Sequence, residues 1–153
     1  MKIYVAGSYD AKETCKEIAN HVMSLGHMVT SNWLYWEPDY TKLQDEKLDE
    51  KIKKLDLAAI EVASGLIVYT DVPSSKGGWL FESGVCEGWN MFARFASPES
   101  RKFIHLIGTN PRPNAFFTGI VNYPTLENFY QKWPNPPVDE DPEVKKESEF
   151  TLE

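Results

Sequence analysis

The sequence contains little cysteine, little histidine and fewer basic than acidic residues. The two cysteines, Cys15 and Cys86, and the three histidines do not show the spacing of metal ligands, so no zinc site is predicted. Both cysteines fall on apolar helical stripes, and we expect them to be buried and reduced. The 16 basic and 23 acidic residues give a formal charge of −7. This charge argues against a nucleic-acid polymer as partner, because such binding uses clustered lysine and arginine.

Long apolar segments are also missing. The first ten residues, MKIYVAGSYD, lack the apolar core of a signal peptide, and no run approaches the length of a membrane span. These absences predict a cytoplasmic protein with no membrane partner. The last part, residues 134–153, is rich in proline and acidic residues and has too few apolar side chains to build a core. We therefore expect one domain over residues 1–133 and a mobile tail, whose role in binding a partner is left open.

The rest of the chain alternates apolar strands with amphipathic helices. Strand-like runs occupy residues 2–7, 27–33, 65–70, 102–108 and 121–123. Helical periodicity follows Asp10, a candidate N-cap, recurs over residues 45–63 and 79–94, and returns after Thr125, a second candidate N-cap. Such alternation predicts βαβ crossovers. We expect a flavodoxin-like or Rossmann-like α/β fold, with a parallel sheet of about five strands and helices on both faces.

The stretch SSKGGWLFESG contains a glutamate in an unusual position. Glu82 lies three and four positions before Val85 and Cys86, on the helical stripe that should face the protein. A carboxylate there needs a hydrogen-bond partner, because burying it without one costs several kcal/mol of desolvation free energy. The alternative is that Glu82 only stabilises the first turn of its own helix. Its place on the apolar stripe favours a functional role.

Ligands of open parallel sheets bind beyond the carboxyl ends of the strands. Three segments reach that edge, namely GSYD, SNWLYW and TDVPSSKGGWLFE. In the last one, Gly77 and Gly78 let the backbone approach a ligand, and the helix dipole would favour an ionised Glu82, as a nucleophile requires. The chain has no P-loop, no GxGxxG turn and no GxSxG elbow, so no cofactor is expected.

These segments resemble the nucleoside 2-deoxyribosyltransferase family, which also contains 2'-deoxynucleoside 5'-phosphate N-hydrolases. The likeness runs from residue 2 to about residue 133 and lies in KIYVAGS, VTSNW, KKLDLAAIEVASGLIVYTDVP and above all GGWLFESGVCEG. The resemblance implies that Glu82 attacks the anomeric carbon of a nucleoside and forms a glycosyl ester. It also implies that Tyr4 orients this carboxylate and that Asp56 binds the substrate and handles its proton.

A larger set of residues is expected to bind the substrate, several of them only through the resemblance. They are Gly7, Ser8, Trp33, Asp71, Ser75, Lys76, Gly77, Gly78 and Asn114. Several of these assignments have simpler alternatives. Tyr4 fits a strand core, Asp56 a solvated helix face, Asp71 a turn before Pro73, and Lys76 the surface. The aromatic group of Trp33, Tyr35 and Trp36 is suited either to stacking on a nucleobase or to ordinary packing.

The sequence departs from the resemblance at the expected phosphate pocket. Nucleotide hydrolases of this family have an arginine two residues after the serine, where this chain has Asp10, which would repel a phosphate. Lys76 could offset that repulsion. Trp79 and Phe81 stand where relatives are often polar. Together these features favour base transfer between free nucleosides. Hydrolysis of a nucleoside 5'-monophosphate and a non-catalytic nucleotide-binding module are the alternatives.

We also expect a homodimer or a larger homo-oligomer. The predicted helix carries hydrophobic residues on more than one side around Trp89, Met91 and Phe92, more than one sheet face can cover. The resemblance implies self-association as well, with Asn114 or Phe116 approaching the pocket of a neighbouring subunit.

Overall fold

The computed structural model describes residues 1–37, 46–72, 78–109 and 120–134. Its sheet has five parallel strands in the order β2-β1-β3-β4-β5. The strands are β1 (Lys2–Ala6), β2 (Met28–Val29), β3 (Gly65–Tyr69), β4 (Phe103–Ile107) and β5 (Val121–Tyr123). The α-helices of the described part are α1 (Lys12–Ser24), α2 (Glu46–Glu61), α3 (Gly78–Ala96) and α4 (Leu126–Lys132). The predicted fold class is confirmed.

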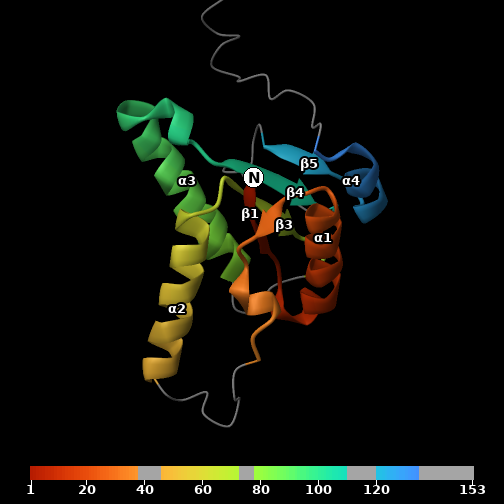
Figure 1. The fold of residues 1–153 in the computed structure, drawn as a ribbon, viewed down its shortest axis with the longest axis horizontal. Helices are drawn as coiled ribbons and strands as arrows, with labels where there is room; N and C mark the ends of the chain where they lie inside the picture. Colours follow the sequence, from red (N-terminus) through yellow and green to blue (C-terminus); the bar gives the residue numbers. More distant parts are fainter. Residues whose placement is uncertain (38–45, 73–77, 110–119, 135–153) are drawn as a thin grey trace, which may run out of the picture.

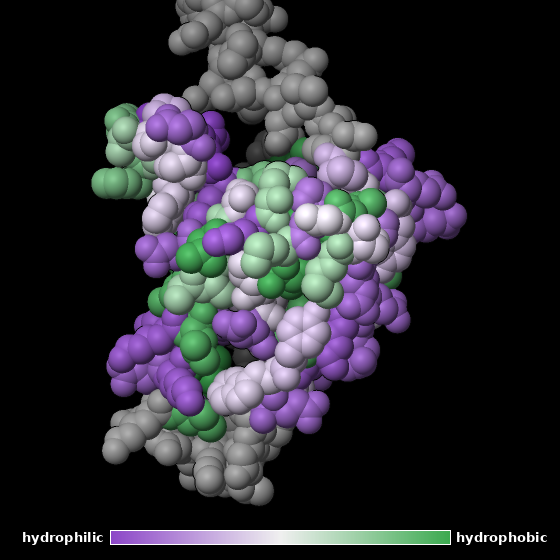
Figure 2. Space-filling view, viewed as in Figure 1, coloured by the Kyte–Doolittle hydropathy of each residue, from purple (hydrophilic) through white to green (hydrophobic). Residues whose placement is uncertain are grey.

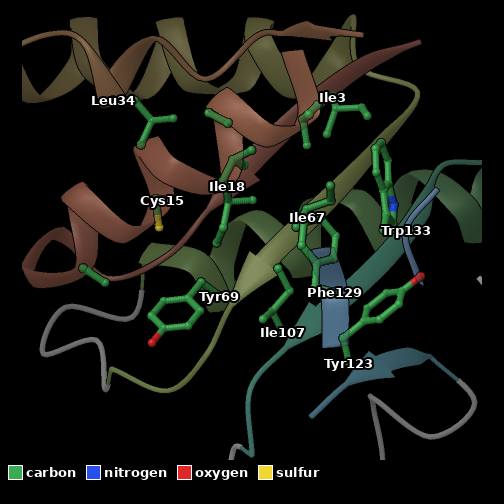
Figure 3. Packing of buried hydrophobic residues seen from close by; sticks show 14 of the residues in the cluster. Ile3, Cys15, Ile18, Leu34, Ile67, Tyr69, Ile107, Tyr123, Phe129 and Trp133 are labelled. Carbon is green, nitrogen blue, oxygen red and sulfur yellow. The ribbon is translucent and has the colours of Figure 1, made fainter. Parts of the chain in front are cut away.

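The helices cover both faces of this sheet, with α1 and α4 on one side and α2 and α3 on the other (Figure 1). Alternate side chains of β1 belong to the two core layers, one on each face of the sheet. Ile3 and Val5 pack with α1 and α4, whereas Tyr4 and Ala6 pack with α2 and α3. Figure 3 shows the first layer from close by, with the side chains of α1 pointing toward β3. Burial on both faces explains why the strands read as continuous apolar runs.

The chain changes sides between the two central neighbours of the sheet. Strand β1 continues into α1 on one face, whereas β3, which pairs with β1, continues into α3 on the opposite face. The two connections therefore diverge at the carboxyl ends of β1 and β3. In open α/β sheets such a switch point is the usual place for a ligand crevice.

The second strand is shorter than the sequence predicts. It ends at Val29, and residues Asn32–Leu34 form a 3-10 turn. Beyond the end of β2, side chains rather than strand residues form hydrogen bonds with the backbone of β1. The Val5 amide donates to Ser31 Oγ at 2.5 Å, and the Trp33 indole donates to the Val5 carbonyl at 2.9 Å. Because these bonds satisfy the backbone of β1, no further strand residues are needed there.

The two predicted helix caps have different outcomes. Thr125 caps α4 as predicted, since its hydroxyl accepts a 3.1 Å hydrogen bond from the amide of Asn128. The prediction for Asp10 is wrong. Asp10 lies inside a 3-10 turn, Tyr9–Ala11, whose N-cap is Ser8, and α1 begins after this turn without a side-chain cap.

Both cysteines are buried free thiols, as the sequence predicts. Among the described residues, no helix has the length and hydrophobicity needed to cross a membrane. The expected tail lies outside the described residues except for Pro134.

We predict that Gly7 is required for α1 to pack on β1. A Cβ atom on Gly7 would lie 2.5 Å from Cys15 Sγ, so Gly7→Ala should lower the free energy of unfolding by about 1–3 kcal/mol. In a Cys15→Ala background the sulfur is gone and the loss should be smaller. Urea unfolding of the single and double variants measures this coupling. Gly78→Ala, at a position with open space around it, is the control. Equal losses in both backgrounds would contradict the prediction.

Candidate active site

The site begins with a tyrosine in the middle of the central strand. Tyr4 is fully buried on the face of β1 that α2 and α3 cover. Its hydroxyl donates a 2.6 Å hydrogen bond to Oε1 of Glu82, which stands in the second turn of α3. The contact between these residues that the resemblance implies is therefore present. The packing around β1 holds the phenol of Tyr4 in place, and the hydrogen bond from that phenol positions the carboxylate of Glu82.

A second carboxyl group acts on the same phenol. Asp56, in α2, is near enough to the Tyr4 hydroxyl to raise the pKa of Tyr4, and the hydroxyl in turn offsets part of the rise in the pKa of Asp56. We call Asp56, Tyr4 and Glu82 the carboxyl cluster. It joins three elements that are distant in sequence. A phenol has only one proton to donate, so it can donate to only one carboxylate at a time.

The carboxyl cluster opens into a pocket of about 470 Å³ between α2 and α3. The lining side chains recur at helical spacing, so each helix contributes one stripe. They are Asp49, Ile52, Lys53, Asp56 and Leu57 from α2, and Gly78, Phe81 and Glu82 from α3. Figure 2 shows hydrophobic residues along the side of α2 that faces the body of the molecule and hydrophilic residues on its outer side. The pocket thus combines an apolar wall with convergent acidic groups, as small-molecule sites commonly do.

Burial controls the charge of the cluster. It raises the pKa of Glu82 to about 7, the Tyr4 hydrogen bond offsets part of that rise, and the charge of Asp56 adds to it. Burial also raises the pKa of Asp56. The pKa of Tyr4 is raised as well, first by burial and then by the two carboxylates, so the phenol stays protonated. The sequence analysis expects the helix dipole to favour the ionised form of Glu82. This residue lies beyond the first turn of α3, and desolvation is the largest influence on its pKa, which is raised.

Two carboxyl groups with raised pKa values can divide the roles of acid and base. Near neutral pH one member of such a pair can hold a proton while the other is ionised. The ionised member is able to attack an electrophilic carbon, and the protonated member is able to donate to a leaving group. The arrangement therefore has the parts of an acid–nucleophile pair beside one orienting phenol.

Three predicted binding residues lie at the carboxyl ends of β1 and β3. Ser8 is buried, and its hydroxyl accepts from the Asp10 amide at 3.4 Å. Gly7 is half-buried beside Cys15, and Gly78 lines the pocket at the start of α3.

Asp71 and Trp33 instead contact other parts of the protein. The Asp71 carboxylate accepts from the amide of Thr109 at 2.7 Å and from its hydroxyl at 3.2 Å, so it joins the segments that follow β3 and β4. Trp33 is half-buried between the two core layers and donates to β1. Four predicted residues lie outside the described residues, namely Ser75, Lys76, Gly77 and Asn114.

Sequence reasoning missed part of the pocket lining. Asp49, Ile52 and Lys53 precede Asp56 by seven, four and three positions, so they share its face of α2. This helical spacing from Asp56 is the sequence signal that could have identified them as pocket residues. In the part of the chain that the structure describes, no group of three or more histidine, cysteine, aspartate or glutamate residues could hold a metal ion.

Comparison with known proteins gives a likeness in fold. No protein-family model matches the chain, and no curated protein matches it in sequence. Among solved structures it is similar to the CMP N-glycosidase BcmB of Clostridium botulinum, with a TM-score of 0.56. The alignment covers 86% of this chain and 97% of the other, at 16% sequence identity. At this identity the likeness establishes a common fold.

We predict that Tyr4→Phe raises the pKa of Glu82 above about 7, because the hydrogen bond that lowers it is lost. The pKa of Asp56 should rise in the same variant. Titration of ¹³C-labelled carboxyl groups by NMR measures both values. Tyr9→Phe, at an exposed position, is the control. An unchanged or lower pKa of Glu82 would show that Tyr4 does not stabilise its ionised form.

Proposed function

We propose that the protein cleaves the N-glycosidic bond of a nucleoside or nucleotide through a glycosyl ester on Glu82. The observation that carries this proposal is the carboxyl cluster, with its raised pKa values, at the wall of a pocket. Two carboxyl groups in different environments are what a retaining glycosidase needs. The fold shared with a CMP N-glycosidase supports the same reaction class.

In the proposed first step, an ionised Glu82 attacks C1' of the sugar. The bond from C1' to the base nitrogen breaks through an oxocarbenium-like state, and its electrons pass to the base. In the reactive state the one proton that the pair shares lies on Asp56, which donates it to the leaving base, so the charges balance. Tyr4 holds Oε1 of Glu82 and leaves the second oxygen for the attack. Water, which Asp56 deprotonates, then attacks C1', and the bond from C1' to the Glu82 oxygen breaks, so the carboxylate of Glu82 is released.

Base transfer is the second candidate. If a nitrogen of a second base, rather than water, attacks C1' and displaces the Glu82 carboxylate, the product is a new nucleoside. The motifs shared with deoxyribosyltransferases favour transfer, whereas the name of the structural neighbour, a CMP N-glycosidase, favours hydrolysis of a nucleotide. Incubation with nucleosides and with their 5'-monophosphates, each with and without a second base, separates the candidates by chromatography. Intact substrates in every mixture would support the non-catalytic alternative.

Glu82→Gln tests the nucleophile directly. The amide keeps the shape of the side chain but cannot form the ester, so we expect turnover to fall by roughly three orders of magnitude or more while the fold stays intact. Because the remaining proton of the pair is lost with a pKa of about 7, kcat/KM of the wild type should fall as the pH rises through that value, since Asp56 then has no proton to donate. Glu87→Gln, at an exposed position of the same helix, is the control. Normal turnover by Glu82→Gln would rule out the covalent mechanism.

We further propose that two copies associate through α3. The helix exposes six large hydrophobic side chains, Leu80, Phe81, Trp89, Met91, Phe92 and Phe95. Phe92 and Phe95 are 76% and 89% exposed, and Figure 2 shows hydrophobic surface at that end of α3. Gly84 and Gly88 leave open space beside the helix, which lets a second helix approach closely.

Light scattering tests this association. The wild type should have at least twice the mass of the 17.5 kDa chain, and Phe92→Glu with Phe95→Glu should convert it to a monomer, because buried charges oppose the contact. Met23→Glu, at an exposed position of α1, should leave the mass unchanged. A wild-type mass of one chain at all concentrations would exclude the dimer.

A further inference from the structure

Helix α2, which carries Asp56, is anchored to the body of the protein near its C-terminal end. In the described part of this segment the buried residues are Ala59, Ile60 and Ala63, and all of them follow Asp56. The Thr30 hydroxyl also donates to the Ala59 carbonyl at 3.0 Å. Before Asp56 the described side chains are exposed or half-buried, and several of them line the pocket. This wall of the pocket is therefore a helix held at one end, and the contacts at that end set the place of Asp56.

A buried ammonium belongs to this anchor. Lys102, which directly precedes β4, is 8% exposed and donates to the carbonyls of Glu61 and Ala63 at 2.8 and 2.5 Å. The last carbonyls of a helix have no partner within the helix and carry negative partial charge, so a cation both satisfies them and is stabilised there. The ammonium also lies 4.8 Å from the centre of the Trp89 ring. Lys102 thus closes the C-terminal end of α2.

The backbone of the same lysine is bound to α3. Asn90, which is 6% exposed, donates from Nδ2 to the Lys102 carbonyl at 2.7 Å. Its Oδ1 accepts from the Lys102 amide at 2.6 Å. Lys102 therefore holds α3 through its backbone and α2 through its side chain. We call this set of contacts the lysine link.

The lysine link lies the same distance along both helices from the carboxyl cluster. Asp56 precedes Ala63 by seven residues, and Glu82 precedes Asn90 by eight residues. Each separation is about two helical turns. A tilt of α2 at the lysine link would therefore move Asp56 relative to Glu82, which stays with α3. Displacement of a reacting group by about 1 Å is enough to lower a rate by about 100-fold.

We propose that Lys102 is a positioning residue, which sets the distance between Asp56 and Glu82 by holding α2 to α3. Its effect on catalysis rests on the proposed function, whereas the positioning itself is a property of the protein without substrate. Lys102 is not one of the described residues that line the pocket, so it acts through Asp56 rather than on the substrate.

Titration of ¹³C-labelled carboxyl groups by NMR tests the positioning without any substrate. Lys102→Met keeps the length of the side chain and removes its donors, so α2 should move and Asp56 should lose burial. Because burial is the main cause of the raised pKa of Asp56, this pKa should fall. Loss of a positive charge alone would raise it.

Tyr4→Phe adds a second readout to the same titration. In the Lys102→Met background it should change the pKa of Asp56 less than in the wild type, because Asp56 has already moved away from the phenol. The response of Glu82 to Tyr4→Phe should persist, since α3 keeps this residue beside Tyr4.

Turnover tests the catalytic consequence. For the nucleoside or 5'-monophosphate that the wild type cleaves, kcat should fall by about 10–100-fold in Lys102→Met, because the acid is misplaced. Lys102→Arg should restore most of the rate, since a guanidinium has donors for both carbonyls. Lys54→Met, which removes an exposed lysine of α2 paired with Glu50, is the matched control and should leave kcat and both pKa values unchanged.

An unchanged pKa of Asp56 in folded Lys102→Met, with an unchanged response to Tyr4→Phe, would overturn the proposal. Equal losses of turnover in Lys102→Met and Lys54→Met, or in Lys102→Met and Lys102→Arg, would overturn it too. If Lys102→Met does not fold, Lys102→Gln is titrated instead, because its shorter neutral side chain keeps a donor but loses the charge. If the wild type cleaves no nucleoside or nucleotide, the proposed function fails, and the NMR titration still decides the role of Lys102.

Discussion

The hydrogen bond from Tyr4 to Glu82 connects the central strand of the sheet to α3, the helix that carries this carboxyl group. Tyr4 has no exposed surface, so its hydroxyl is placed by the packing of the core rather than by a loop. Glu82 takes its position from that hydroxyl, and the charge of Asp56 acts on the same group. A group held in this way needs no reorganisation before it can act. The geometry of the carboxyl cluster thus depends on the same contacts that stabilise the sheet.

Charge is distributed unevenly around the switch point. Acidic groups gather on the side of α2 and α3, where Asp56 and Glu82 share one phenol. The buried ammonium of Lys12 lies at the start of α1, on the other face of the sheet. The sheet thus separates a buried ammonium on one face from the two carboxyl groups on the other.

The sequence predicts the fold well, because alternating strands and helices leave few topologies. The inward direction of Glu82 also follows from its helical stripe, whereas the partner Tyr4 was available only through a family resemblance, since it lies 78 positions away. The raised pKa of Glu82 does not follow from the sequence, because desolvation depends on neighbours from other elements. The burial of Lys12 does not follow either. Near a helix start a lysine is expected at the surface, and only the tertiary structure buries it.

The side-chain bonds that complete β1 have a consequence for the behaviour of the protein in solution. Strand β2 pairs with only the first part of β1, which leaves one edge of the central strand without a strand neighbour beyond Ile3. Ser31 and Trp33 occupy the amide and the carbonyl of Val5 at that edge. Unpaired strand edges are templates for pairing between molecules and therefore for aggregation. The indole that looked suited to a nucleobase thus shields an interior strand from other chains.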